Sequence, residues 1–389
     1  MSTPREQPAR FGWKKTLVFS LLPALLLVAA LESAARVFEL WAPPRTVDIG
    51  QGFTEESRLF VPDPDNPDML VTSPNKVVDV RGQQLFRPQA FAREKKPDTF
   101  RAFFLGGSSV NYLDHELPMF EKRLATALPA YDDAEIINCG GLSYGSHRLV
   151  RIAAEVLSYA PDAILIYSGH NEFEELEQYA LSKPASVPLQ EVLSHSALYR
   201  VVRDRIAALQ LDRLERDQNA RIAQESIPDS ARAWGYDFSE EEVEARAANY
   251  RDNLARIIAM CRDADVAVVI GTVPSNLVRP ALPGESGERY EAEVIPLFEA
   301  GKYEEGKAHA QEILSNVARH QASAVENGII RSLADRMQAP LADVAQAVAE
   351  AEPHGVPGET LFNDHCHLNP EGNKLLIREY EKQLGQLFD

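Results

Sequence analysis

Five apolar runs, each bounded by glycine, proline or other turn-forming residues, most constrain the fold of this chain. The runs are residues 100–107, 135–141, 163–169 and 266–272, with a weaker one at 340–344. Strands that are apolar on both faces suit a parallel sheet that helices cover on both sides. We therefore expect a parallel sheet of about five strands.

Helical patterns separate these runs. Residues 146–160 and 240–264 carry apolar side chains at helical spacing, and a last helix begins near Pro370, a residue favoured in the first turn of helices. The alternation of strands and helices predicts an α/β sandwich.

Two segments interrupt this alternation, at about 174–239 and 280–336. The first is rich in Arg, Glu and Gln. The second contains residues 298–314, which look like half of a tetratricopeptide-type hairpin, a unit that cannot bury its apolar face alone. We predict that both are helical insertions that cap one end of the sheet. Local packing of amphipathic helices is the alternative.

The N-terminus carries an uncharged apolar run, residues 16–31, behind a basic tail. Extended to residue 38, this run approaches the ~20 apolar residues that a membrane-spanning helix needs. We expect a cytoplasmic tail at 1–15 and a transmembrane anchor or uncleaved signal at 16–38 that crosses the inner (cell) membrane once. Basic flanks stay inside, so the rest of the chain faces the periplasm or exterior. The alternative is a cleaved signal peptide with its small-residue site at 33–35.

Two further units follow the anchor. Residues 39–98 are rich in Pro, Asp and Asn, which predicts an irregular extension, with two short strands within 76–88. Residues 99–389 contain the five apolar runs and are predicted to form the α/β domain.

Charge and cysteine content limit the function classes. A net charge of −18 argues against nucleic acid as a partner, because phosphate backbones require a basic face. Three cysteines are too few and too scattered for a disulfide framework, although Cys139 and Cys366 are one candidate pair.

Polar residues follow three of the apolar runs, where the strands of an open parallel sheet end and ligands bind. Ser108 follows two glycines. A serine at a helix start has a free N–H and a positive helix end beside it, which suits a nucleophile, and a plain N-cap serine is the alternative. The glycine-rich turn 138–148 can point N–H groups at an anion. Asn171 can donate to an oxyanion, and one such donor contributes on the order of 10²–10³ in rate.

The segment 363–373, "NDHCHLNPEGN", holds the remaining reactive side chains. Asp364 and His367 are three residues apart, so both can face one way in a turn. The histidine would then act as general base, and the carboxylate would fix its tautomer. A metal site would use Asp364, His365 and His367. The nearest further ligands, Asp162 and His170, lack ligand-like spacing, so we expect no metal and no cofactor.

Together, these stretches resemble the SGNH superfamily of serine hydrolases, also called GDSL-like esterases. The resemblance covers roughly 99–172, 240–278 and 336–388. It implies a flavodoxin-like three-layer sandwich. It also implies that Ser108 is the nucleophile, His367 the base and Asp364 its orienting partner, and that the Ser108 N–H and Asn171 bind the oxyanion.

The chain departs from the family pattern in three places. Gly107 stands before the serine where the family has an acidic residue, and Glu172 replaces an aspartate. The glycine of the second block has no single counterpart. Counting five from Asn138 reaches Ser143, whereas glycines stand at 140 and 141, so Gly141 and Ser143 both remain candidates for an oxyanion donor. Ser109 is the fallback nucleophile.

The resemblance implies acyl transfer. Anchored relatives that face outward often add or remove acetyl groups on polysaccharides, so the implied substrate is an acyl ester of a glycan or lipid. Esterase and O-acyltransferase activity are not separated. The alternative is a non-catalytic envelope protein that keeps the fold and binds a partner through its helical insertions.

Overall fold

The computed structural model describes most of the chain. The described residues are 13–41, 58–74, 76–77, 79–80, 83–175, 192–193, 195–206, 209, 213, 216, 238–282, 284–358 and 360–388. Most of the predicted insertion 174–239 and most of the predicted cytoplasmic tail therefore lie outside the described residues.

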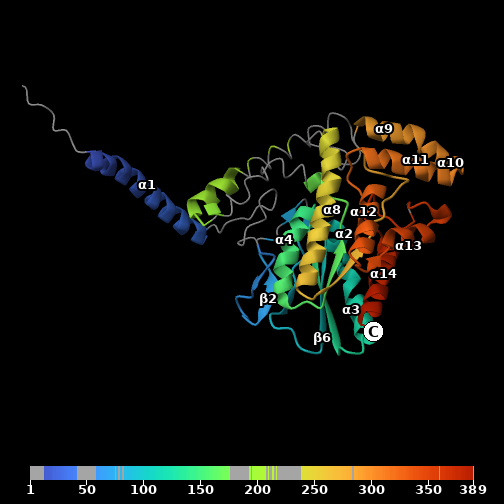
Figure 1. Ribbon diagram of the computed structural model, residues 1–389, viewed down its shortest axis with the longest axis horizontal. Helices are drawn as coiled ribbons and strands as arrows, with labels where there is room; N and C mark the ends of the chain where they lie inside the picture. The colour runs from blue at the N-terminus through green and yellow to red at the C-terminus, as the bar shows by residue number, and fades with distance from the viewer. Residues whose placement is uncertain are drawn as a thin grey trace, which may run out of the picture.

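A five-stranded, wholly parallel sheet forms the centre of the α/β domain (Figure 1). In the spatial order β10-β9-β8-β6-β7, the strands are Leu341–Ala342, Ala267–Gly271, Ala163–Tyr167, Thr99–Gly106 and Asp133–Gly140. Counted along the chain this is the order 2-1-3-4-5 of flavodoxin-like folds. Every residue of β6 and β8 is buried, as continuous apolar runs predict. The predicted fold class is confirmed.

Helices cover both faces of the sheet. One layer contains α4 (Ser146–Val156), α8 (Glu240–Asp263) and α12 (Ala324–Arg336), which pack side by side. The other contains α3 (Leu117–Ala127) and α14 (Pro370–Phe388), with α13 (Val344–Ala351) against α14 (Figure 1). The last helix begins at the predicted Pro370.

The described part of the N-terminal extension is more regular than its composition indicated. β1 (Phe60–Pro62), β2 (Met69–Thr72) and β5 (Ala90–Ala92) form a small antiparallel sheet. The expected pair of short strands is present as β3 (Asp79–Val80) and β4 (Gln83–Gln84). Rings at positions 60 and 91 pack against Phe103 of β6, which joins this small sheet to the main core.

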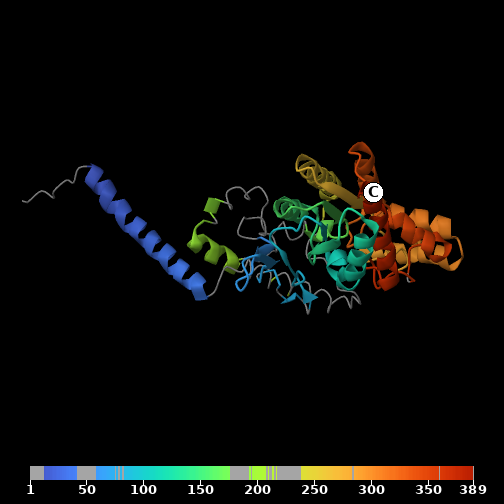
Figure 2. The same ribbon diagram turned by 90° about the horizontal axis from the view of Figure 1, so that it is seen from below.

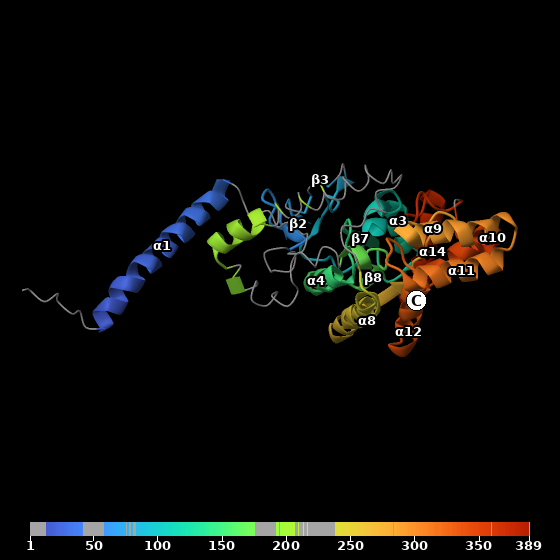
Figure 3. The same ribbon diagram turned by 90° about the horizontal axis from the view of Figure 1, so that it is seen from above.

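The second insertion builds its own core. Helices α9 (Gly284–Glu293), α10 (Ile295–Glu299) and α11 (Tyr303–Asn316) stand together in Figure 3. They bury a separate apolar cluster of Leu277, Leu282, Tyr290, Val294, Ala310, Ile313, Leu314 and Val356. The hairpin of α10 and α11 alone would leave an apolar face exposed. The helix α9 covers that face. The helix α12, by contrast, contributes Ile330 and Leu333 to the main core beneath the sheet.

The helix α1 (Trp13–Trp41) projects from the rest of the chain (Figures 1 and 2). Within it, Leu21–Trp41 is long and apolar enough to cross a membrane, and almost none of it is buried by the protein. A core helix of a soluble protein would be covered, so a membrane anchor or a signal sequence is the interpretation that fits this helix.

Arg101 is a buried charge on which we expect the stability of the core to depend. Its side chain is fully buried and donates to Glu135 Oε1 (2.5 Å), the Tyr159 carbonyl (2.8 Å) and the Ala92 carbonyl (2.7 Å). Arg101→Met would leave these acceptors without a donor, so we expect a loss of about 3 kcal/mol or more in the free energy of unfolding. Urea denaturation of the full chain in detergent measures this loss.

The matched control is Arg93→Met, which removes an exposed arginine from the neighbouring turn. We expect it to change stability by no more than about 0.5 kcal/mol. Equal effects of the two substitutions would refute a structural role for the buried guanidinium.

Candidate active site

Two glycines bring Ser108 to the end of the sheet. Strand β6 ends at Gly106, and Gly107 precedes the short helix α2 (Ser108–Asn111). A Cβ on Gly106 would lie 2.4 Å from the Tyr167 carbonyl oxygen, and one on Gly107 would lie 2.2 Å from Asn171 Nδ2. Larger residues here would separate β6 from the loop after β8. The glycines therefore let the serine and Asn171 approach each other.

Ser108, His367 and Asp364 form a continuous chain of hydrogen bonds. His367 Nε2 lies 2.7 Å from Ser108 Oγ, and His367 Nδ1 lies 2.6 Å from Asp364 Oδ2. The serine and histidine are separated by 259 positions in the sequence. This arrangement of hydroxyl, imidazole and carboxylate can move a proton off the hydroxyl.

The loop before α14 fixes the Asp364 carboxylate in position relative to the His367 imidazole. Asp364 Oδ1 accepts the backbone N–H groups of Cys366 and His367, each at 2.8 Å. Burial alone would raise the pKa of Asp364, but the hydrogen bond and charge of His367 outweigh it and hold that pKa below its usual range. The carboxylate is therefore ionised at neutral pH.

Asn276 hydrogen-bonds to the backbone of the same loop. We did not single this residue out from the sequence. It is fully buried, its Nδ2 donates to the Asp364 carbonyl at 3.0 Å, and its N–H donates to the His365 carbonyl at 3.0 Å. The only signal in the sequence is its place four residues after the fourth apolar run.

The two candidates for the second oxyanion donor differ in their backbone hydrogen bonds. The Gly141 N–H donates to the Gly106 carbonyl at 3.1 Å, so it is already occupied. Ser143 has φ +61°, a left-handed conformation that glycine adopts most readily. Its N–H donates no hydrogen bond to any other residue that the structure describes. Ser143 thus stands where a glycine would be favoured.

Asn171 points its amide toward the same region. Its Nδ2 donates one N–H to the Tyr144 carbonyl at 3.1 Å and is buried against Gly107. One bond fixes the orientation of the amide, and the second N–H of the group remains for an oxyanion.

Two glutamates after Asn171 fasten its loop to α4. Glu172 accepts from the N–H (3.0 Å) and hydroxyl (2.7 Å) of Ser146, and Glu175 accepts from the N–H groups of Gly145, His147 and Arg148. Both carboxyls lie at the positive end of the helix. Burial, followed by the nearby charge of Glu175, raises the pKa of Glu172 to about 8.

His170, Asp162 and Ser109, the other ligand and nucleophile candidates, lie outside the chain of hydrogen bonds that joins Ser108, His367 and Asp364. Burial, together with His367 and His365, lowers the pKa of His170 to about 3, and its Nδ1 accepts the Ala322 N–H at 3.1 Å. Asp162 precedes β8, at the opposite end of the strand from the site, and binds Lys95. Among the described residues Ser109 Oγ has no hydrogen-bond partner, so the fallback nucleophile lacks a base.

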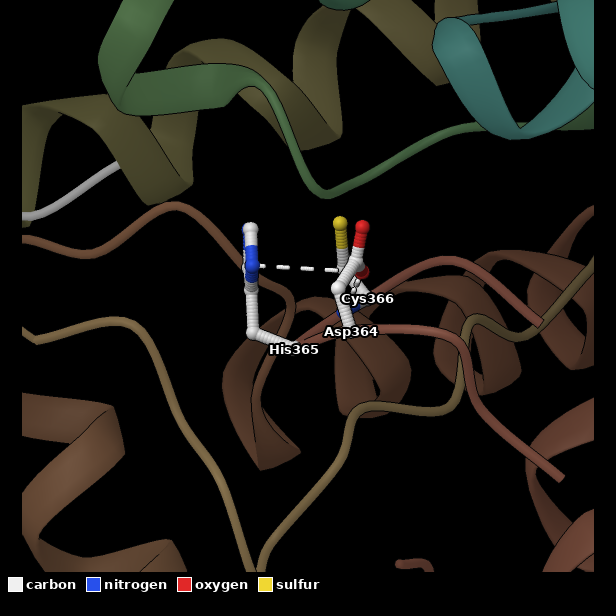
Figure 4. A group of neighbouring side chains, drawn as sticks. All are labelled: Asp364, His365 and Cys366. Atoms are coloured by element: carbon white, nitrogen blue, oxygen red, sulfur yellow. Dashed lines mark hydrogen bonds and ion pairs between the residues drawn. The ribbon is translucent and has the colours of Figure 1, made fainter. Parts of the chain in front are cut away.

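Asp364, His365 and Cys366 form a group whose potential ligand atoms lie within 4.8 Å of one another (Figure 4). Both Asp364 oxygens already accept hydrogen bonds within the loop, which makes this carboxylate a poor fit for a metal. Cys139 and Cys366 form no disulfide, and all three cysteines are buried thiols.

No family model matches the chain, and no curated protein matches it. Solved structures similar to it include a putative acylhydrolase from Bacteroides fragilis at 11% identity, covering 74% of this chain and 88% of that one, with a TM-score of 0.40. The acetyl xylan esterase AlAXEase is similar at 15% identity, covering 73% and 98%, with a TM-score of 0.40.

The acetylxylan esterase Axe2 from Geobacillus stearothermophilus is similar at 10% identity, covering 75% of this chain and 97% of that one, with a TM-score of 0.39. The similar structures are thus GDSL-like lipases, acylhydrolases and acetylxylan esterases.

Glu172 gives a testable pH dependence of stability. Its pKa is about 8 in the folded chain, against 4.5 for a free glutamate. A raised pKa adds stability that is complete below the unfolded pKa and is lost as pH rises through the folded one. The natural chain should therefore lose stability relative to Glu172→Gln between about pH 5 and pH 9, as followed by urea denaturation.

The same substitution at the exposed Glu371 controls for loss of one charge. A stability difference between the natural chain and Glu172→Gln that stays constant over this pH range would rule out a protonated, buried Glu172.

Proposed function

We propose that this chain is an SGNH-type serine hydrolase that cleaves or transfers an acyl ester. Ser108 is the nucleophile, His367 the general base and Asp364 the residue that orients the base. The observation that carries the proposal is the hydrogen-bonded chain Ser108–His367–Asp364, with distances of 2.7 and 2.6 Å.

The reaction proceeds in two steps. His367 Nε2 takes the Ser108 proton as Oγ attacks the ester carbonyl, and it then gives that proton to the leaving alkoxide. Water or an acceptor hydroxyl, deprotonated by the same nitrogen, then releases the acyl group from the serine. Asp364 keeps the Nδ1 proton directed toward itself and stabilises the imidazolium that forms.

Three N–H groups support an oxyanion site for the tetrahedral intermediate. These are the backbone N–H groups of Ser108 and Ser143 and one side-chain N–H of Asn171. Ser108 begins α2, so its N–H has no acceptor within that helix. Gly141 is left out because its N–H is occupied.

The same proposal places the enzyme at a membrane. α1 crosses the inner membrane once, with its basic flank inside, and the α/β domain faces the periplasm or exterior, where acyl esters of glycans and lipids are present. An uncleaved anchor is favoured over a signal peptide because α1 continues past positions 33–35 to Trp41, and its Glu39 pairs with Arg200 at 2.6 Å.

A fluorophosphonate probe tests the nucleophile. The full chain in detergent should be labelled at Ser108, because an activated serine attacks the phosphorus centre as it attacks an ester. Ser108→Ala should abolish labelling, and His367→Ala should slow it by on the order of 10³ or more. Mass spectrometry of the labelled peptide identifies the site.

Ser109→Ala is the matched control and should keep its label. A chelator should leave labelling unchanged, and loss of labelling on chelation would favour a metal site at 364–366. A folded chain with no labelled serine would exclude the hydrolase and favour the partner-binding alternative.

The oxyanion assignment makes a second prediction. Asn171→Ala should lower kcat for a small ester by about 10²–10³, because a side-chain donor is lost. Ser143→Gly should keep kcat within a few-fold, because the donor is backbone N–H and glycine accepts φ +61°. A loss of equal size in Ser143→Gly would contradict the assignment of its N–H.

A further inference from the structure

The end of α1 is tied to a second helix far along the chain. Residues 197–206 are helical, and all three ribbon views show this segment beside the end of α1 nearest the α/β domain. Glu32 accepts hydrogen bonds from the hydroxyl of Ser196 (2.7 Å) and the N–H groups of Ala197 and Leu198 (both 3.0 Å). A carboxylate of α1 thereby caps the positive end of the second helix.

Two further contacts complete this junction. Arg200 forms a bidentate pair with Glu39, with Nε 2.8 Å from Oε1 and the second nitrogen 2.6 Å from Oε2. Arg36 binds Glu32 at 2.9 Å and the His195 carbonyl at 3.3 Å. Each carboxylate on the last turns of α1 thereby has a partner in residues 196–200, whereas Arg36 stays largely exposed.

The opposite side of this segment exposes three apolar side chains, with the exposed Arg205 at its border. Val202, Ile206 and Leu209 are 48%, 50% and 67% exposed, and their spacings of four and three place them on one helical face. Arg200 and Arg203, in contrast, are buried. This distribution is inverted relative to a helix on a water-soluble surface, where apolar side chains turn inward.

The apolar face continues onto α1. The last residues of that helix also expose large apolar side chains, namely Val37, Phe38, Leu40 and Trp41. Paired charges between the helices and apolar side chains outside them are what a two-helix unit needs where it borders lipid.

The length of α1 determines where its junction with residues 195–200 lies relative to the bilayer. Its 29 residues extend about 43 Å at 1.5 Å per residue, whereas the hydrocarbon core of a bilayer is about 30 Å thick. The uncharged run 16–31 covers about 24 Å, so the charged turns that begin at Glu32 reach the outer boundary of the hydrocarbon core. The segment bound there lies at the same level.

We propose that Val202, Ile206 and Leu209 insert into the acyl–headgroup boundary of the membrane that α1 crosses, so that the helix 197–206 and Leu209 are a second, interfacial membrane contact. The occupant of this face is the bilayer itself, because the face is continuous with the helix that spans it. The inference rests on the membrane placement of α1 in the proposed function, and not on the catalytic assignment.

Spin labels on single introduced cysteines test the proposal. The full chain carries Val202→Cys, Ile206→Cys or Leu209→Cys and is reconstituted into vesicles of phosphatidylethanolamine and phosphatidylglycerol. The three natural cysteines are buried, so the introduced thiol takes the label. Collision rates with oxygen, which concentrates in lipid, and with a water-soluble nickel chelate report the surroundings of each label.

Two matched positions calibrate the readout. Met119→Cys labels an apolar side chain of α3 that is 56% exposed and distant from α1, and Leu25→Cys labels α1 itself, where Leu25 is 65% exposed. We expect oxygen collisions to exceed nickel collisions at 202, 206, 209 and 25, and the reverse at 119.

The interfacial contact would be overturned if the labels at 202, 206 and 209 behaved like the one at 119 while the label at 25 was in lipid. That result would leave the anchor intact. A label at 25 that also meets the nickel chelate would show that α1 is not in the bilayer. That result would remove both this inference and the membrane part of the proposed function.

Discussion

The site depends on how closely two parallel strands and their loops approach at the carboxyl end of the sheet. Gly106 abuts the Tyr167 carbonyl and Gly107 abuts the Asn171 amide, and neither position has room for a Cβ. Because Ser108 follows at once, this close approach sets where its hydroxyl lies relative to Asn171. The fold therefore supplies the geometry, and the two glycines make that geometry sterically attainable.

Buried charges hold the surrounding loops. Glu172 and Glu175 cap α4 and so fasten the loop that carries Asn171. Farther out, Glu326 of α12 binds Arg319 at 2.7 Å and also pairs with Arg246 of α8, and both guanidinium groups lie over the Phe173 ring. Removing one member would leave another buried charge unpaired, which is strongly destabilising. Each of these three charges therefore holds the other two, and the loop beside them, in place.

The sequence was most informative where a pattern is local. The apolar runs predicted the parallel sheet because strands buried on both faces need no knowledge of their neighbours. Ser108, Asp364 and His367 stood out because each lies in a short polar stretch beside a strand end or helix start. The spacing of Asp364 and His367 predicted a shared orientation, and the structure has them 2.6 Å apart. The sequence pattern of the second insertion indicated helices, but it did not show that α9 packs with α10 and α11 around a separate core.

What the sequence by itself determined is the class of fold, the apolar helix at its start and the residue types that meet at the strand ends. Only the tertiary structure shows that the Gly141 N–H donates to the Gly106 carbonyl, a hydrogen bond that no local pattern indicates. The same holds for Asn276 beneath the Asp364 loop and for Glu32 at the start of the 197–206 helix. Each is a contact between residues far apart in the chain, and such pairings are set by how the layers pack rather than by any local pattern.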